Sequence, residues 1–147
     1  MNYMDIALKE AEKAAARGEV PIGAVIVDST TGEIIARAGN QSEADHDPSA
    51  HAEVVAIRNA CQKLSSTRLP QCDLYVTLEP CTMCATAISF ARIRRLYFGA
   101  YDPKGGGVDH GARFYEQATC HHKPDVYGGI LESACSEILR RFFQEKR

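Results

Sequence analysis

Two cysteines three residues apart follow a proline in the segment Thr77-Leu78-Glu79-Pro80-Cys81-Thr82-Met83-Cys84. Positions i and i+3 of a helix lie on the same side, so Cys81 and Cys84 can direct both thiols at one metal ion. The N-terminus of a helix also stabilises thiolates, which are the form that binds metal. A Cys-x-x-Cys pair equally suits a redox pair or two core cysteines. The spacing alone leaves these readings open.

A second motif, His51-Ala52-Glu53, stands at the expected start of another helix. Alone, such a histidine is more often a cap, and such a glutamate more often favours the helix dipole. Taken with the cysteines, His51 becomes a third ligand, and Glu53 sits beside the metal without binding it. Three protein ligands leave a fourth position for water, which is typical of catalytic zinc. We therefore predict one Zn²⁺ per subunit on His51, Cys81 and Cys84, with Glu53 as the catalytic acid and base.

The remaining cysteines and histidines make poorer ligand sets. Cys61 and Cys72 lack the spacing of a zinc pair. Neighbours in the segment Cys120-His121-His122 would point to opposite faces of an extended chain, so we interpret it as a loop without metal. Six cysteines in a chain without a secretory signal indicate thiols or metal ligands, and not a disulfide framework.

Length and composition predict one soluble domain over residues 1–147. The apolar fraction of 45% and the charged fraction of 24% are ordinary for globular proteins. A formal net charge of −2 gives no general sign of nucleic-acid binding, so any such contact needs a local basic patch. We find no run of about 18 apolar residues and no secretory signal, and expect no membrane association and a cytoplasmic location.

Helical and strand patterns alternate along the chain. We expect a fold of the α/β class, in which helices cover both faces of a mixed sheet and form a three-layer α/β/α sandwich. Asp47 or Ser49 is expected to cap the second helix, and Pro80 to start the third. The expected helices are residues 2–17, 50–64, 81–92 and 131–144, and the expected strands are 23–28, 33–38, 73–78, 94–99 and 124–128. The last helix is predicted to share one apolar face: Leu131, Ala134, Cys135, Ile138, Leu139, Phe142 and Phe143.

Several segments beyond the two motifs carry a family resemblance. They are Glu19-Val20-Pro21-Ile22-Gly23-Ala24, Gly39-Asn40, Ala50-His51-Ala52-Glu53, the cysteine segment, and Phe98-Gly99-Ala100. With the His-x-Glu and Pro-Cys-x-x-Cys signature, the sequence resembles the cytidine/deoxycytidylate deaminase superfamily. Within it, the flanking segments and the Phe142-Phe143 ending are similar to the bacterial tRNA adenosine deaminase branch.

This resemblance implies a cytidine deaminase-like fold with a five-stranded mixed sheet, and a homodimer. It implies conversion of adenosine to inosine at the wobble position of an arginine tRNA anticodon. It places substrate contacts at Asn40, Val20, Pro21, Ala52 and Asp102. Without the resemblance, we would interpret Asn40 as a turn residue and Val20-Pro21 as the segment that leads into a strand. Asp102 would be a solvent-exposed acid in a loop.

Three questions stay open at this point. RNA contacts need positive charge, for which we favour Arg140, Arg141, Lys146 and Arg147 over the cluster Arg92, Arg94 and Arg95. The glycines Gly105-Gly106-Gly107 lack the Gly-Lys-Ser/Thr of a phosphate cradle, so we interpret them as a flexible loop. The alternative functions are a deaminase of a free base or nucleoside such as guanine, and a zinc-stabilised binding module.

Overall fold

The computed structural model describes residues 2–146, so Arg147, an expected RNA contact, lies outside the described residues. Each observed α-helix and strand starts and ends within two residues of its expected range, and one short 3₁₀ turn was not expected. The elements run α1 (Tyr3–Ala16), β1 (Gly23–Asp28), β2 (Ile34–Gly39), α2 (Ala52–Leu64), β3 (Cys72–Leu78), α3 (Thr82–Phe90), β4 (Arg95–Ala100), a 3₁₀ turn η1 (Phe114–Glu116), β5 (Asp125–Tyr127) and α4 (Glu132–Glu145).

The strands form one mixed sheet in the order β2-β1-β3-β4-β5. β1 pairs antiparallel with both β2 and β3, whereas β3, β4 and β5 run parallel to one another. The two parallel connections contain α3 and η1. The five-stranded mixed sheet expected from the sequence is confirmed.

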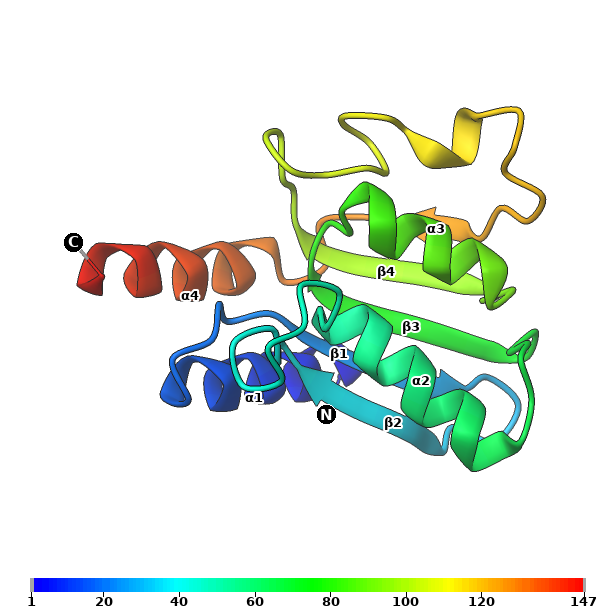
Figure 1. Ribbon diagram of the computed structural model, residues 1–147, viewed down its shortest axis with the longest axis horizontal. Coiled ribbons are helices and arrows are strands. Elements are labelled where there is room, and N and C mark those ends of the chain that lie inside the picture. The colour runs from blue at the N-terminus through cyan, green and yellow to red at the C-terminus, as the bar shows by residue number, and fades with distance from the viewer. Residues whose placement is uncertain (1, 147) are drawn as a thin grey trace.

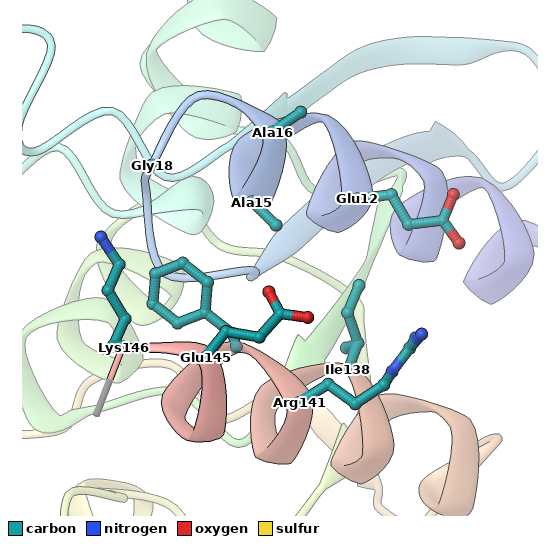
Figure 2. Close-up of a pocket in the computed structure, with 9 residues that line it drawn as sticks. Glu12, Ala15, Ala16, Gly18, Ile138, Arg141, Glu145 and Lys146 are labelled. Carbon is teal, nitrogen blue, oxygen red and sulfur yellow. The ribbon is translucent and has the colours of Figure 1, made fainter.

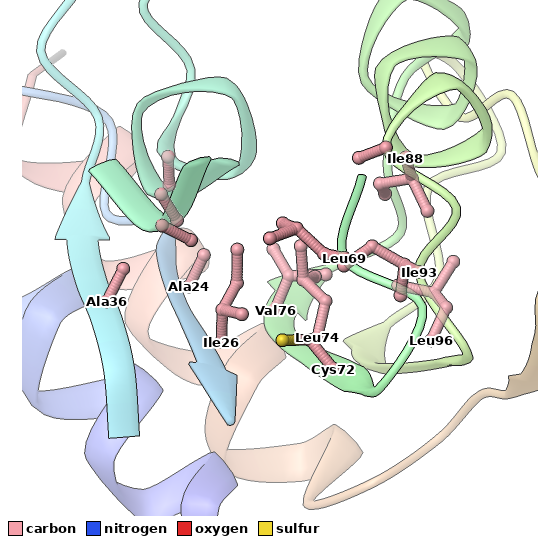
Figure 3. Packing of buried hydrophobic residues seen from close by; sticks show 14 of the residues in the cluster. Ala24, Ile26, Ala36, Leu69, Cys72, Leu74, Val76, Ile88, Ile93 and Leu96 are labelled. Carbon is pink, nitrogen blue, oxygen red and sulfur yellow. The ribbon is translucent and has the colours of Figure 1, made fainter. Parts of the chain in front are cut away.

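Helices cover both faces of the sheet, as Figure 1 shows, with α1 and α4 on one side and α2 and α3 on the other. The alternating side chains of β1 explain why both faces are apolar. Ala24 and Ile26 join the core beneath α2 and α3, and Val25 and Val27 face α1. Figure 3 shows the larger core, in which β-strand side chains meet Ile88 of α3. This packing fixes the start of α2 beside the start of α3.

The expected starts of α2 and α3 are wrong. The N-cap of α2 is His51, because Asp47 and Ser49 bond to each other in a local turn, with Asp47 Oδ1 accepting from Ser49 N at 2.9 Å and Ser49 Oγ at 2.7 Å. The N-cap of α3 is Cys81, so Pro80 precedes the helix and does not start it.

The expected apolar face of α4 is also only partly buried. Cys135 and Ile138 are buried, but Ala134 is exposed, and Leu131 and Phe143 expose 40% and 50% of their surface. The reason is the position of α4, which extends past the ends of the strands at which α2 and α3 begin (Figure 1). Its C-terminal half therefore overhangs the sheet and borders open space near those helix starts.

Candidate metal centre and active site

Three expected ligands come together in the fold. Within residues 2–146, His51, Cys81 and Cys84 form a group whose ligand atoms all lie within 4.8 Å of one another. His51 Nδ1 lies 3.6 Å from Cys81 Sγ and 3.5 Å from Cys84 Sγ. Tetrahedral zinc, with its usual bond lengths to nitrogen and sulfur, separates such atoms by roughly 3.5 Å. The donor set and its spacing therefore fit zinc.

Two helix starts position these ligands. His51 and Cys81 are the N-cap residues of α2 and α3, yet neither side chain makes a capping hydrogen bond. Their side chains face each other instead, and Cys84 joins them from the first turn of α3. Two helix N-termini thus direct their positive dipole ends at the same point, which favours thiolates there.

Ionisation of the two thiols supports a cation at this point. The hydrogen bond with Cys84, followed by that with His51, lowers the pKa of Cys81 to about 4. The hydrogen bond with Cys81 and burial raise the pKa of Cys84 instead. The two pKa values move in opposite directions because the thiols share one hydrogen bond, and a cation between the sulfurs would favour the thiolate form of both.

Glu53 stands beside this cluster in the first turn of α2, with only 4% of its surface exposed. Burial raises the pKa of its carboxyl to about 7, and the negative charge of Cys81 adds to the effect. Among residues 2–146, Glu53 is not a member of the group of three ligands, although its carboxyl lies within hydrogen-bonding reach of the Cys84 thiol. A buried carboxyl with such a pKa is suited to proton transfer near neutral pH.

Asn40 is held in one orientation at the end of β2. Its side-chain Oδ1 accepts from the backbone N–H of Ala52 at 2.9 Å, and Arg17 Nη2 donates to its main-chain carbonyl at 3.1 Å. The side-chain oxygen is therefore occupied, which leaves the Nδ2 amide as a donor for an acceptor on a bound molecule. Ala52 is fully buried and acts here through its backbone.

A hollow reaches the metal-ligand cluster at His51, and we call it the inner hollow. Val20 lines it, whereas Pro21 is buried and is not among the lining residues. Its lining combines the α2 start, a loop after β2 and the end of α4: Gly18, Glu19, Val20, Asn40, Ser42, Glu43, His51, Phe142, Phe143 and Lys146.

A second hollow, the outer hollow, adjoins the first because Val20 and Phe143 line both. Asp102 lines only the outer hollow, on the loop that follows β4. Its lining residues are Val20, Leu78, Ala100, Tyr101, Asp102, Lys104, Gly105, Ser136, Leu139 and Phe143. Of the expected substrate contacts, Val20, Asn40 and Asp102 thus line one or both of the two hollows, whereas Pro21 and Ala52 line neither.

The expected basic contacts on α4 face different ways. Lys146 lines the inner hollow, and its Nζ lies 5.3 Å from the centre of the Phe142 ring. Arg140 and Arg141 both pair with Glu137. Figure 2 shows Arg141 and Lys146 at opposite ends of a groove between α1 and α4. Lys146 is thus the one member of the expected set, among the described residues, that reaches the inner hollow.

The rival basic cluster is engaged within the fold. Arg94 makes a two-point contact with Asp73, at 2.9 and 2.7 Å. The Arg95 guanidinium lies over the Tyr127 ring at 6.0 Å and within 4.0 Å of Asp125. Arg92 donates to the carbonyl of Ser89 at 3.1 Å.

The segment Cys120-His121-His122 belongs to no metal-ligand group among residues 2–146.

The glycine triplet lies in a loop, as expected, but two of its glycines pack inside the fold. Gly106 and Gly107 are buried, and a Cβ on Gly106 would lie 2.3 Å from Glu79 Oε2. A Cβ on Gly107 would lie 2.5 Å from the backbone nitrogen of Thr82, in the first turn of α3. The glycines are required because this loop packs against the helix that carries Cys84.

Glu19 and Glu79 are buried acids for which the sequence predicts no role, although both lie in the segments that carry the family resemblance. Their surfaces are each 2% exposed, and both carboxylates accept hydrogen bonds from loop backbone. Burial acts to raise the pKa of Glu79, but the N–H donors of Asp102 and the residues around His110 outweigh it and lower that pKa. The available signal was an acid beside apolar residues at the border of a strand: Glu79 directly follows β3, and Glu19 stands before Val20 ahead of β1.

Comparison with known proteins gives the family. Residues 1–100 match the model of the "cytidine and deoxycytidylate deaminase zinc-binding region". The chain belongs to this deaminase family. It is 62% identical to a tRNA-specific adenosine deaminase of Agrobacterium fabrum, over 99% of this chain and 95% of that protein. The corresponding protein of Bacillus subtilis is 47% identical, over 99% and 89% of the two chains. The chain therefore belongs to the tRNA-specific adenosine deaminases within the family.

Solved structures agree with the fold. One from a study of A-to-I editing by tRNA:A34 deaminases at the wobble position superposes with a TM-score of 0.91 and 61% identity, covering 93% of this chain and 98% of that one. A guanine deaminase from Bacillus subtilis superposes with a TM-score of 0.66 and 32% identity, covering 100% and 94%. Among the described residues, the helices are too short or too polar to span a bilayer.

Proposed function

We propose that this chain is a zinc-dependent deaminase that converts adenosine to inosine at the wobble position of an arginine tRNA. The observation that carries the proposal is the 62% identity to a tRNA-specific adenosine deaminase along nearly the whole of both chains. The His51, Cys81 and Cys84 cluster with buried Glu53 supplies the chemistry that such a reaction needs.

His51, Cys81 and Cys84 are the residues that hold zinc, one ion per subunit, within a single domain of residues 1–147. When bound there, zinc lowers the pKa of water so that it can act as a nucleophile near neutral pH. The two thiolates balance the charge of the cation. His51 binds through Nδ1, the nitrogen that faces both sulfurs.

Glu53 is the proton carrier of the reaction. Its carboxylate takes a proton from the attacking water, whose oxygen forms a bond to C6 of adenine, and delivers that proton to the ring nitrogen. Glu53 then takes the second proton from the new C6 hydroxyl and delivers it to the amine at C6. The C6–N bond breaks, ammonia leaves, and the C6 carbonyl of inosine remains. One carboxyl can serve both steps because burial keeps its pKa at about 7, close to the working pH.

Asn40 orients the base. Because Ala52 occupies its Oδ1, the Nδ2 amide can donate to an acceptor on the purine edge. Val20 supplies apolar contact in the inner hollow, Pro21 supports Val20 from a buried position, and Asp102 and Lys146 contact the flanking nucleotides.

The active form is a cytoplasmic homodimer that binds tRNA. The outer side of α3 supports a protein–protein contact, because Phe90 exposes 67% of its surface and Met83 exposes 39%. Isolated surface apolar residues are common, but two on one short helix suit burial against a second copy.

The test is incubation of purified protein with an arginine tRNA transcript, followed by sequencing of the anticodon. We expect inosine at the wobble position for the wild type and none for Glu53→Ala, with zinc bound in both. Wild-type protein that carries zinc and yields no inosine would overturn the proposal.

A second candidate is deamination of a free base, since a guanine deaminase from Bacillus subtilis shares the fold at 32% identity. The same metal ligands would serve either substrate. Ammonia release from free guanine, with none from tRNA, would select this candidate. A zinc-stabilised binding module would release ammonia from neither.

A further inference from the structure

Two buried carboxylates hold the two loops that border the hollows. Glu79, whose side chain is fully buried, accepts from the backbone N–H groups of Asp102 at 3.0 Å, Val108 at 3.3 Å, Asp109 at 3.0 Å and His110 at 3.1 Å. His110 Nδ1 also lies 2.8 Å from Glu79 Oε1. A carboxylate only accepts, so the imidazole N–H donates.

Glu19 makes the same kind of contact on the other side. Its two oxygens accept from the backbone N–H groups of Glu43 at 3.2 Å and Ala44 at 2.8 Å. Neither carboxylate has a lysine or arginine partner among the described ion pairs. Burial of a carboxylate is unfavourable unless several donors compensate it, so each loop must keep its donors in place.

The two anchored loops are walls of the adjoining hollows. Glu43, held by Glu19, lines the inner hollow, and the segment from Asp102 to Gly105, which starts at a Glu79 contact, lines the outer one. Gly106 packs directly on the Glu79 carboxylate, which leaves this wall no room to shift inward. The two carboxylates therefore fix the position of these loops through backbone donors, next to the metal ligands, since Glu79 is two residues from Cys81 and Glu19 lines the inner hollow with His51.

We propose that Glu79 and Glu19 are positioning residues that fix these two loops for the RNA strand on either side of the target adenosine. They set the affinity for RNA and leave the chemical step to Glu53 and the metal ligands. This inference rests on the proposed function for its substrate, and on the hydrogen bonds alone for its structural part.

The test uses Glu79→Gln and Glu19→Gln, with Glu12→Gln as the matched control, because Glu12 is exposed on α1. A glutamine amide cannot accept at both positions, so donors of the loop lose a partner. On an anticodon stem-loop RNA we expect KM to rise about tenfold for either variant, with kcat within about twofold and zinc content unchanged. Glu79→Asp should recover part of the loss, and Glu12→Gln should match the wild type.

Amide hydrogen exchange gives a readout that does not depend on turnover. Exchange should accelerate about tenfold at Val108, Asp109 and His110 in Glu79→Gln only, and at Glu43 and Ala44 in Glu19→Gln only. If wild-type protein failed to deaminate RNA, the proposed function would fail while this exchange pattern still tested the anchors.

Three results would overturn the inference. One is an unchanged KM in both variants. Another is a loss of kcat with unchanged KM, which would place the carboxylates in the chemical step. The third is loss of zinc or of folding in Glu79→Gln together with wild-type KM in Glu19→Gln, which would make Glu79 a support of the metal centre alone.

Discussion

The metal-ligand cluster and the α4 wall of the inner hollow are built in different ways. The cluster with Glu53, which we call the floor, consists of His51, which lines the hollow, and of Cys81, Cys84 and Glu53 beside it, and two helix starts that pack on the sheet place these residues. The α4 wall consists of Phe142, Phe143 and Lys146, on a helix end that overhangs the sheet and stays partly exposed. The residues of the reaction thus lie on well-packed elements. The residues that contact a large substrate lie on the exposed end of α4, which can adjust its position to that substrate.

The largest effect should come from breaking the floor at a buried ligand. In Cys84→Ala we expect zinc content to fall roughly tenfold or more, and deamination to fall below detection. Metal analysis and an inosine assay on the same preparation check both. Cys135→Ala is the control, since Cys135 is also buried but belongs to α4 and packs in the core on the other face of the sheet. Equal loss of zinc in both variants would contradict the assignment.

The next largest effect is on the free energy of unfolding, and it should differ between a phenylalanine packed under the floor and one on the wall. Phe98 is fully buried in the core beneath α3, and Phe143 exposes half of its surface. Phe98→Ala should lower the free energy of unfolding by about 3–5 kcal/mol. Phe143→Ala should lower it by less than about 1 kcal/mol. Urea unfolding of both variants measures the difference, and similar values would show that α4 belongs to the cooperative core.

The smallest effect should come from the charge on the wall. Lys146→Ala should raise KM for tRNA by a few-fold and leave kcat unchanged, because one phosphate contact is lost. The salt dependence of log KM should become shallower by about one unit of slope. Lys63→Ala is the control, since Lys63 pairs with Glu33 at the other end of α2. An unchanged salt slope would remove Lys146 from the RNA contacts.

The floor could be predicted from the sequence because its ligands lie in two short motifs at helix starts. Their side-chain types and spacing carry the chemistry, so the fold had only to bring two segments together. The strand pattern similarly predicted the mixed sheet, since residues such as Ile26 and Val27 alternate between two apolar faces.

The wall and the loop anchors could not be predicted in the same way. Glu79 and Glu19 bond to backbone N–H groups, which every residue except proline offers, so the partners leave no trace in sequence. The apolar stripe of α4 predicted a buried face, yet Phe143 is exposed because the helix runs beyond the sheet. The close packing of Gly106 could not be predicted either, since its spatial neighbour Glu79 is distant along the chain.

The central claim is that Glu53 performs proton transfer on the floor without holding the metal. The direct measurement is the single-turnover rate of Glu53→Gln on saturating tRNA, beside its zinc content. We predict wild-type zinc, unchanged tRNA affinity and a rate lower by about 10²–10⁴-fold. A near wild-type rate, or a loss of zinc that accounts for the lost rate, would contradict the claim.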